Sequence, residues 1–170
     1  QSLEVLFEQA LDASKAGEFS QALQFWDELL ELEPNNPAAL SNRGNVRLAM
    51  GDLQGSISDQ NMAIRILPEK SDSYINRAIA EEALGMLNAA EEDYQLILTR
   101  DPNDASALFN LANLKGSQGD WDGAAVLYKK ASIARPGFSM ARASSALAQY
   151  QIGQLADAES EFRSLIRRYP

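Results

Sequence analysis

Blocks of the sequence have apolar residues spaced with the period of an α-helix. The breaks between these blocks recur at a fixed interval. Five glycines and five of the six prolines each recur every 34 residues, at Gly17, Gly51, Gly85, Gly119, Gly153 and at Pro34, Pro68, Pro102, Pro136, Pro170. A glycine can end a helix in the left-handed conformation, and a proline cannot continue one. The pattern therefore predicts ten helices in five pairs, with repeats at 3–36, 37–70, 71–104, 105–138 and 139–170 and no β-strand.

Two columns of small residues predict how the two helices of a repeat pack. Residue 8 of the repeat is Ala10, Gly44, Ala78, Ala112 and Ala146, and residue 20 is Ala22, Ser56, Ala90, Ala124 and Ala158. Larger residues stand beside these columns, such as Leu6, Leu40, Tyr74 and Leu108 at residue 4 and Trp26, Tyr94, Tyr128 and Phe162 at residue 24. Large residues beside small ones let two helices interdigitate at interior density, so we expect a close crossing within each repeat.

The chain resembles the tetratricopeptide repeat family over residues 3–170, because small residues, glycine, aromatic residues and proline recur at these spacings. The resemblance implies an all-α fold, an α-solenoid of five helix-turn-helix repeats that forms a right-handed superhelix. It also implies one solenoid domain over residues 1–170, whose first helices line a concave groove that binds another polypeptide. Because the chain starts with Gln1, we expect a piece of a longer protein. We expect that protein to continue past Pro170 with a helix that covers the last repeat.

Two repeats depart from this pattern in a correlated way. Residue 7 of the repeat is Arg43 in repeat 2 and Arg77 in repeat 3, and residue 23 is then an aspartate, Asp59 or Asp93. In repeat 4 both positions are leucine. This correlation predicts an ion pair across each of the two helix pairs, and the alternative is that the arginines bind a ligand in the groove. Repeat 2 also has Gln60 where the other repeats have an aromatic residue.

The implied groove face carries asparagines at equivalent places of successive repeats. Residue 6 of the repeat is Asn42, Asn76 and Asn110, and residue 9 adds Asn45 and Asn113. An amide side chain can donate and accept, so a series of amides suits the backbone of an extended peptide. The predicted peptide-binding residues are these five asparagines together with Phe7, Ile75, Phe109 and Tyr150. The alternative is that the asparagines are only solvated surface residues.

One function known in the resembled family can be tested on the residues. Co-chaperones of the heat-shock proteins hold a terminal carboxylate with lysine, asparagine and arginine side chains from three successive repeats. The matching positions here are Ser41, Asn45, Asn76, Ser106 and Asn110. The asparagines match, but every cation is missing, and a carboxylate then has no charged partner. We therefore expect a partner peptide other than the heat-shock carboxylate motif.

Composition narrows the class of function. The chain has a net charge of −9, no histidine and no cysteine. The acidic balance disfavours nucleic acid and anionic membrane surfaces, and no apolar run is long enough for membrane insertion. Without histidine, cysteine, a glycine-rich phosphate loop or metal-ligand spacing, we expect neither an enzyme nor a cofactor. We expect a soluble intracellular protein, and the segment 42–44 resembles repeats frequent in cyanobacterial and plastid proteins.

Charge is distributed unevenly among the repeats. Residues 3–36 carry eight acidic residues and one basic residue, whereas residues 105–138 have a net charge of +2. A partner with basic side chains would be steered toward the N-terminal half. The leading hypothesis is a protein-interaction scaffold that binds an extended or helical peptide in its groove, as an adaptor or assembly factor. The alternative is a structural unit that self-assembles through its terminal repeats, with a homo-oligomer formed through the C-terminal repeat.

Overall fold

The computed structural model describes residues 2–168, which form ten α-helices and no β-strand. The helices are α1 (Leu3–Ala16), α2 (Phe19–Leu32), α3 (Pro37–Ala49), α4 (Leu53–Ile66), α5 (Ser71–Ala83), α6 (Leu87–Arg100), α7 (Ala105–Ser117), α8 (Trp121–Ala134), α9 (Ser139–Gln151) and α10 (Leu155–Arg168). The first helix of every pair begins 34 residues after the previous one, at the residue where the repeat was predicted to begin. The prediction of an all-α helical repeat fold is confirmed.

The local sequence explains where the helices begin and end. All five glycines of the 34-residue series have positive φ, from 78° to 84°, and each stands between the two helices of a pair. Short polar side chains cap the next helix start: Asn36 accepts a hydrogen bond from Ala39 N, and Asp52 accepts one from Gly55 N. Of the five prolines in the series, the first four lie in the turns between pairs, and Pro170 lies outside the described residues.

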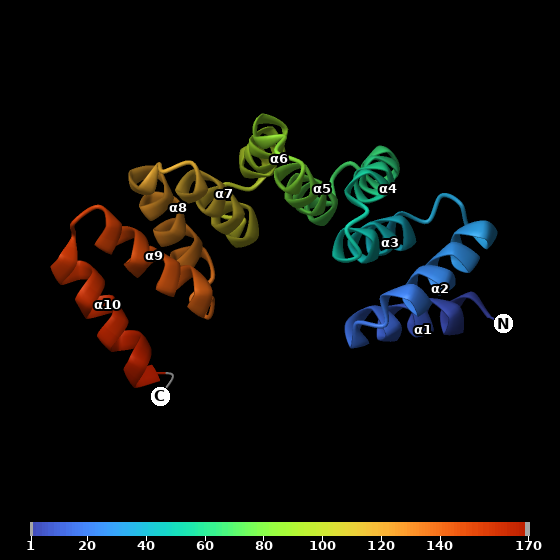
Figure 1. Cartoon of the computed structure of the whole chain (residues 1–170), viewed down its shortest axis with the longest axis horizontal. Coiled ribbons are helices and arrows are strands. Elements are labelled where there is room, and N and C mark those ends of the chain that lie inside the picture. The colour runs from blue at the N-terminus through green and yellow to red at the C-terminus, as the bar shows by residue number, and fades with distance from the viewer. Residues whose placement is uncertain (1, 169–170) are drawn as a thin grey trace. The chain divides into compact units, whose positions relative to one another are not determined.

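The chain divides into two compact units, unit 1 (Gln1–Ala90) and unit 2 (Glu91–Pro170), and the division falls within α6. In unit 1 the first helices α1, α3 and α5 contact one another in turn and form one layer (Figure 1). The second helix α2 packs against α1 and α3, and the second helix α4 packs against α3 and α5. In unit 2, α7 packs on α8, α8 on α9 and α9 on α10. The single solenoid domain expected over residues 1–170 stays a prediction.

The small-residue columns are buried in both units, as expected from the sequence. Ala10 and Ala22 are fully buried where α1 crosses α2, next to Leu6 and Trp26, which are also fully buried. In unit 2, buried alanines of α7, α8 and α9 surround Tyr128. Removing an aromatic side chain from such a core costs about 3–5 kcal/mol, so these crossings hold each helix pair together.

The last helix differs from the others at the aromatic position. Trp26, Tyr94 and Tyr128 are buried at this position, but Phe162 of α10 is 37% exposed. Leu155 and Ile166, on the same helix, are also exposed. The physical reason is that the extensive packing of α10 within residues 2–168 is against α9, which leaves much of its other face exposed.

Substituting alanine for Gly119 tests the turn between α7 and α8. Gly119 has a φ of 83°. A Cβ atom in that conformation should lower the free energy of unfolding by about 1–2 kcal/mol, measured by urea denaturation. Gly137 is the matched control, because it has no positive φ and a Cβ there would meet no atom within 4 Å. Equal losses in both variants would contradict the argument.

Candidate functional site

Two asparagines of unit 1 present free amide groups on the first helices. Asn42 of α3 and Asn76 of α5 occupy equivalent places in helices that contact one another. Both residues are half-buried, and neither side chain makes a hydrogen bond to another residue within 2–168. Their donors and acceptors are therefore available to a ligand, which is what the sequence-based interpretation of this position requires.

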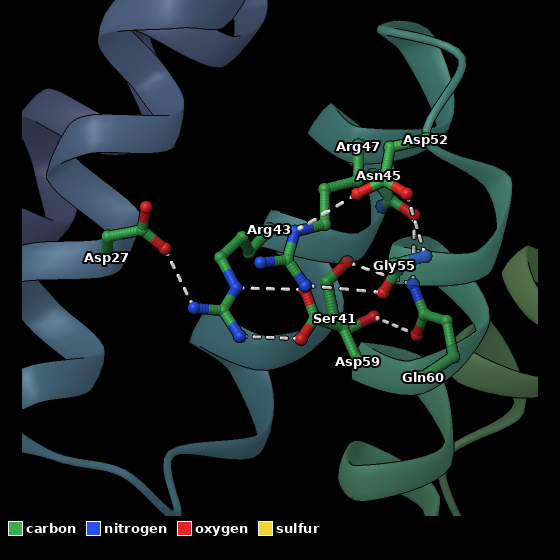
Figure 2. Close-up of polar contacts among 9 residues, drawn as sticks. All are labelled: Asp27, Ser41, Arg43, Asn45, Arg47, Asp52, Gly55, Asp59 and Gln60. Carbon is green, nitrogen blue, oxygen red and sulfur yellow. Dashed lines mark hydrogen bonds and ion pairs between the residues drawn. The ribbon is translucent and has the colours of Figure 1, made fainter.

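Asn45, the third asparagine predicted in unit 1, is tied to the interior. Its Oδ1 atom accepts a hydrogen bond of 3.2 Å from Gln60 Nε2. Gln60 is fully buried where other repeats carry an aromatic ring. Ser41 Oγ donates to Gln60 Oε1 at 3.0 Å, and Gln60 Nε2 donates to the Ser41 carbonyl oxygen at 3.0 Å (Figure 2). Both ends of the buried amide are thus satisfied, which explains how a glutamine replaces the ring.

The glutamine also explains the glycine that faces it. Other repeats have alanine in the column that contains Gly44. A Cβ atom on Gly44 would lie 2.7 Å from Gln60 Nε2 and 3.3 Å from Asp59 Cβ. Since Gln60 is held by hydrogen bonds at both ends of its amide, it has little freedom to move away. Repeat 2 therefore uses a residue without a side chain at the helix crossing.

A buried ion cluster connects three helices of unit 1. Arg43 of α3 binds Asp59 of α4 through two hydrogen bonds, from Nε to Oδ2 at 2.9 Å and from Nη2 to Oδ1 at 2.6 Å (Figure 2). Asp59 is 3% exposed. The predicted Arg43–Asp59 pair is confirmed, and in the structure the Arg43 guanidinium binds aspartates of its own and the preceding repeat. The hydrogen bonds that Arg43 donates to Asp59 and Asp27 raise its pKa above the ordinary value, against the opposing effect of burial.

Two further members of this cluster were not predicted from the sequence. Asp27 of α2, in the preceding repeat, accepts a hydrogen bond from Arg43 Nη1 at 2.8 Å. Arg47, one helical turn after Arg43, lies 3.0 Å from Asp59 Oδ2 through its Nη1 atom. Asp59 therefore faces two arginines, and Arg43 joins neighbouring repeats. These residues line a cavity of about 490 Å³ between α2, α3 and α4, with Leu30, Glu31, Pro34, Leu40, Ser58 and Met62.

The equivalent arginine of repeat 3 has a different observed partner. Arg77 Nη1 donates a hydrogen bond of 2.8 Å to Asn61 Oδ1 on α4. Its Nε atom lies 3.9 Å from Glu81 Oε1, one turn later on α5. Arg77 therefore also connects α5 to the preceding repeat, as Arg43 connects α3 to α2. The pair between Arg77 and Asp93 stays a prediction.

A second cavity, of about 410 Å³, opens at the start of α1 and the end of α2. It is lined by Leu3, Glu4, Phe7, Glu8, Leu29, Glu33 and Asn36. Phe7, one of the predicted binding residues, is half-buried and meets Trp26 edge-on, with ring centroids 5.1 Å apart. Ile75 was predicted for the same surface, but only 9% of it is exposed.

The predicted residues of unit 2 are only partly available. Asn110 Nδ2 donates to the Ser106 carbonyl oxygen of its own helix at 2.9 Å. Asn113 Oδ1 accepts a hydrogen bond of 2.6 Å from the Tyr128 hydroxyl. Burial raises the pKa of Tyr128, so the hydroxyl keeps the proton that it donates. Phe109 is half-buried, whereas Tyr150 is 58% exposed.

Phe109 packs within an aromatic group of unit 2. Its ring centroid lies 5.6 Å from that of Tyr128 and 4.8 Å from that of Phe138. Such pairs contribute about 0.5–1.5 kcal/mol beyond the area that they bury, so Phe109 has a structural role whether or not a ligand contacts it. Among the predicted residues of unit 2, Tyr150 is the one with a largely exposed ring.

Known proteins resemble this chain in sequence and in structure. A family model described as tetratricopeptide repeat matches residues 7–71, 75–137 and 109–170. Serine/threonine-protein phosphatase 5 of Rattus norvegicus is 32% identical over 104 residues, which are 61% of this chain and 21% of that protein. The chain thus spans about a fifth of the length of this curated relative.

Two solved structures share the arrangement of helices. A thermophilic tetratricopeptide repeat protein of Thermus thermophilus superposes with a TM-score of 0.82 at 17% identity, over 99% of this chain and 92% of that one. The first tetratricopeptide repeat domain of Spaghetti (RPAP3), bound to the HSP90 peptide SRMEEVD, gives 0.64 at 25% identity, over 69% of this chain and 93% of that one. The likeness to the Thermus protein shows the fold alone.

Within residues 2–168, no group of three or more acidic residues, histidines or cysteines is placed to hold a metal ion. No helix in that range has the length and apolar character needed to cross a membrane.

Neutralising Asp59 tests the ion cluster. Asp59→Asn leaves Arg43 and Arg47 without their shared buried counter-ion, so the free energy of unfolding should fall by about 3–5 kcal/mol. Asp27→Asn removes the charge of a side chain that is 48% exposed, and should lower the free energy of unfolding by at most about 1 kcal/mol. Chemical denaturation of both variants measures the difference. A loss from Asp59→Asn no larger than the loss from Asp27→Asn would refute the buried role of Asp59.

Alanine substitutions distinguish Asn45 of α3, which bonds the buried Gln60, from Asn42 of the same helix, whose side chain makes no hydrogen bond within residues 2–168. Asn45→Ala removes an acceptor of the buried Gln60 amide and should cost about 1 kcal/mol in the free energy of unfolding. Asn42→Ala removes no internal bond and should change that free energy by less than about 0.5 kcal/mol. Thermal and urea unfolding measure both. The reverse order would mean that Asn42 is the structural residue.

Proposed function

The chain belongs to the tetratricopeptide repeat family, and from this premise we propose that it is a scaffold that binds an extended peptide segment of a partner protein along its first helices. The observation that supports this proposal is the pair of unbonded amides at Asn42 and Asn76. An extended ligand has a backbone donor and acceptor at every residue, and both need partners once water is displaced. An asparagine provides both from a short, uncharged side chain.

Unit 1 supports the proposal better than unit 2. The asparagines of unit 1 are placed on two contacting helices, and a cavity lined by Phe7 opens on the preceding first helix. In unit 2, Asn110 and Asn113 each use one amide atom internally. We therefore assign the main peptide contacts to Asn42, Asn76 and Phe7. Asn45, Asn110, Asn113, Phe109 and Tyr150 are proposed as secondary contacts.

The proposed partner segment is not a C-terminal carboxylate motif. The RPAP3 domain is bound to the HSP90 peptide SRMEEVD, and its similarity to this chain would suggest a similar ligand here. At the positions that would supply the cations, this chain has Ser41, Ser106 and Asn110. Uncharged side chains cannot form the charge-assisted bonds that such a carboxylate needs. We further propose that the chain is not catalytic and binds no nucleic acid.

Self-assembly is the second candidate function, and one observation favours it. Leu155, Phe162 and Ile166 of α10 form an exposed apolar series on one helix. Apolar series of this kind on soluble proteins often mark contact surfaces. If the chain assembles through its C-terminal repeat, sedimentation should show an oligomer that Phe162→Ser disrupts. A monomer at high protein concentration would exclude this function.

Removing the free amides tests the peptide-binding proposal. A random peptide library displayed on phage is selected against the wild-type chain, and the enriched peptides are synthesised with blocked ends. Asn42→Ala combined with Asn76→Ala should weaken their binding by about 2 kcal/mol, or about thirtyfold in Kd, at about 1 kcal/mol for each side chain. Titration calorimetry measures the affinity, and thermal unfolding should be unchanged.

The matched control replaces two exposed asparagines elsewhere in unit 1. Asn35 lies in the turn after α2, and Asn88 lies on α6. Asn35→Ala combined with Asn88→Ala should leave the affinity unchanged. If the control and the test variant lose affinity equally, or if neither does, the first helices are not the binding surface.

A further inference from the structure

The residues that line the cavity at the start of α1 indicate which kind of side chain it would bind. We propose that this cavity is the anchor site of the binding surface and takes a lysine or arginine from a basic, apolar segment of the partner. The inference rests on the proposed function and names the chemistry of the segment. The anchor site comprises Leu3, Phe7 and Leu29 as its floor and Glu4, Glu8 and Glu33 as its rim.

The floor of the anchor site is apolar and fixed. Leu29 is 1% exposed and belongs to the core cluster of unit 1. Phe7 packs edge-on against Trp26, which is fully buried, so its ring cannot turn freely. A floor that is held by the core is formed before a ligand arrives. A ligand therefore loses less conformational entropy on binding than it would at a site that must first be assembled.

The rim of the anchor site is acidic and has no internal counter-ion. Glu4 and Glu8 are separated by one helical turn and lie on the same side of α1. Glu33 lies directly after α2 and accepts a hydrogen bond from Asn36 Nδ2 at 2.8 Å, which leaves its second oxygen available. None of the three carboxylates makes an ion pair within residues 2–168. Like charges one turn apart repel, so a cation placed between them would be stabilising.

The surrounding charge favours a cationic occupant over any other. Residues 3–36 contain eight acidic residues and one basic residue, Lys15. Lys15 stands near the other end of α1, about 16 Å along the helix axis from Glu4 at about 1.5 Å per residue. A carboxylate or phosphate would be repelled here. Lysine and arginine carry a hydrocarbon stem below the charge, and this matches an apolar floor under an acidic rim.

The experiment compares selected peptides on two variants of equal net charge. Glu4→Gln, Glu8→Gln and Glu33→Gln together neutralise the rim. Glu18→Gln, Glu28→Gln and Glu31→Gln together remove the same charge from exposed residues of repeat 1 that do not line the cavity. The probes are the phage-selected peptides with acetylated N-termini, so that their cations are side chains. Fluorescence of Trp26, in a chain with Trp121→Phe, reports binding next to the anchor site.

The inference predicts that selection enriches peptides with a lysine or arginine beside apolar residues. Neutralising the rim should raise their Kd about tenfold, which corresponds to about 1.4 kcal/mol for three exposed charge contacts. The control variant should change Kd less than about threefold, because its charges are farther from the ligand. Replacing the basic residue of a peptide by norleucine should remove the difference between wild type and rim variant. Thermal unfolding checks that both variants fold.

Each other outcome has a defined meaning. Peptides that depend on Asn42 and Asn76 but not on the rim would overturn this inference and leave the proposed function standing. Peptides that are indifferent to both sites, or the absence of enrichment, would contradict both. If the rim variant instead abolishes self-association of the wild-type chain, the occupant is a second copy, and the inference of a partner segment is wrong.

Discussion

The close crossing of the two helices in each repeat is the constraint on which the rest of the structure depends. Alanines at this crossing are fully buried in repeats 1, 3 and 4, and nearly so in repeat 5. A larger side chain at either column would separate the helices and open the core next to Trp26 or Tyr128. Because the crossing fixes the first helix against the second, it also fixes which residues of the first helix face outward.

Repeat 2 keeps this crossing with polar residues in place of apolar ones. Gln60 fills the space of an aromatic ring, Gly44 makes room for it, and Ser41 and Asn45 bond its amide. Beside it, Arg43 binds Asp59 within the repeat and Asp27 in the repeat before. A buried ion cluster contributes less to stability than its short distances suggest, because the charges must be desolvated. Its directional bonds instead set how α3 is placed between α2 and α4.

The sequence was sufficient for the five helix pairs and for the Arg43–Asp59 contact within repeat 2. The fixed spacing of glycine and proline predicted where the first helix of each repeat begins. The replacement of Arg43 and Asp59 by two leucines in repeat 4 predicted that these positions contact one another. Asp27 was missed because a comparison of positions within one repeat does not include the repeat before it. Asn45 and Asn113 were predicted as peptide-binding residues, but whether an amide turns outward or toward Gln60 or Tyr128 depends on rotamers that the pattern does not contain. The small exposed fraction of Ile75, 9%, was likewise not predictable, since the helix position alone did not show how far this residue is covered.

A peptide that binds the first helices should change the environment of Asn42 and Asn76 directly. The most direct measurement is NMR of the side-chain amide groups during titration with a selected, end-blocked peptide. The account predicts that the amide resonances of Asn42 and Asn76 shift in a saturable way, together with the ring of Phe7, while those of Asn35 and Asn88 stay in place. Saturable shifts confined to side chains of α2 and α4, with Asn42 and Asn76 unchanged, would contradict it.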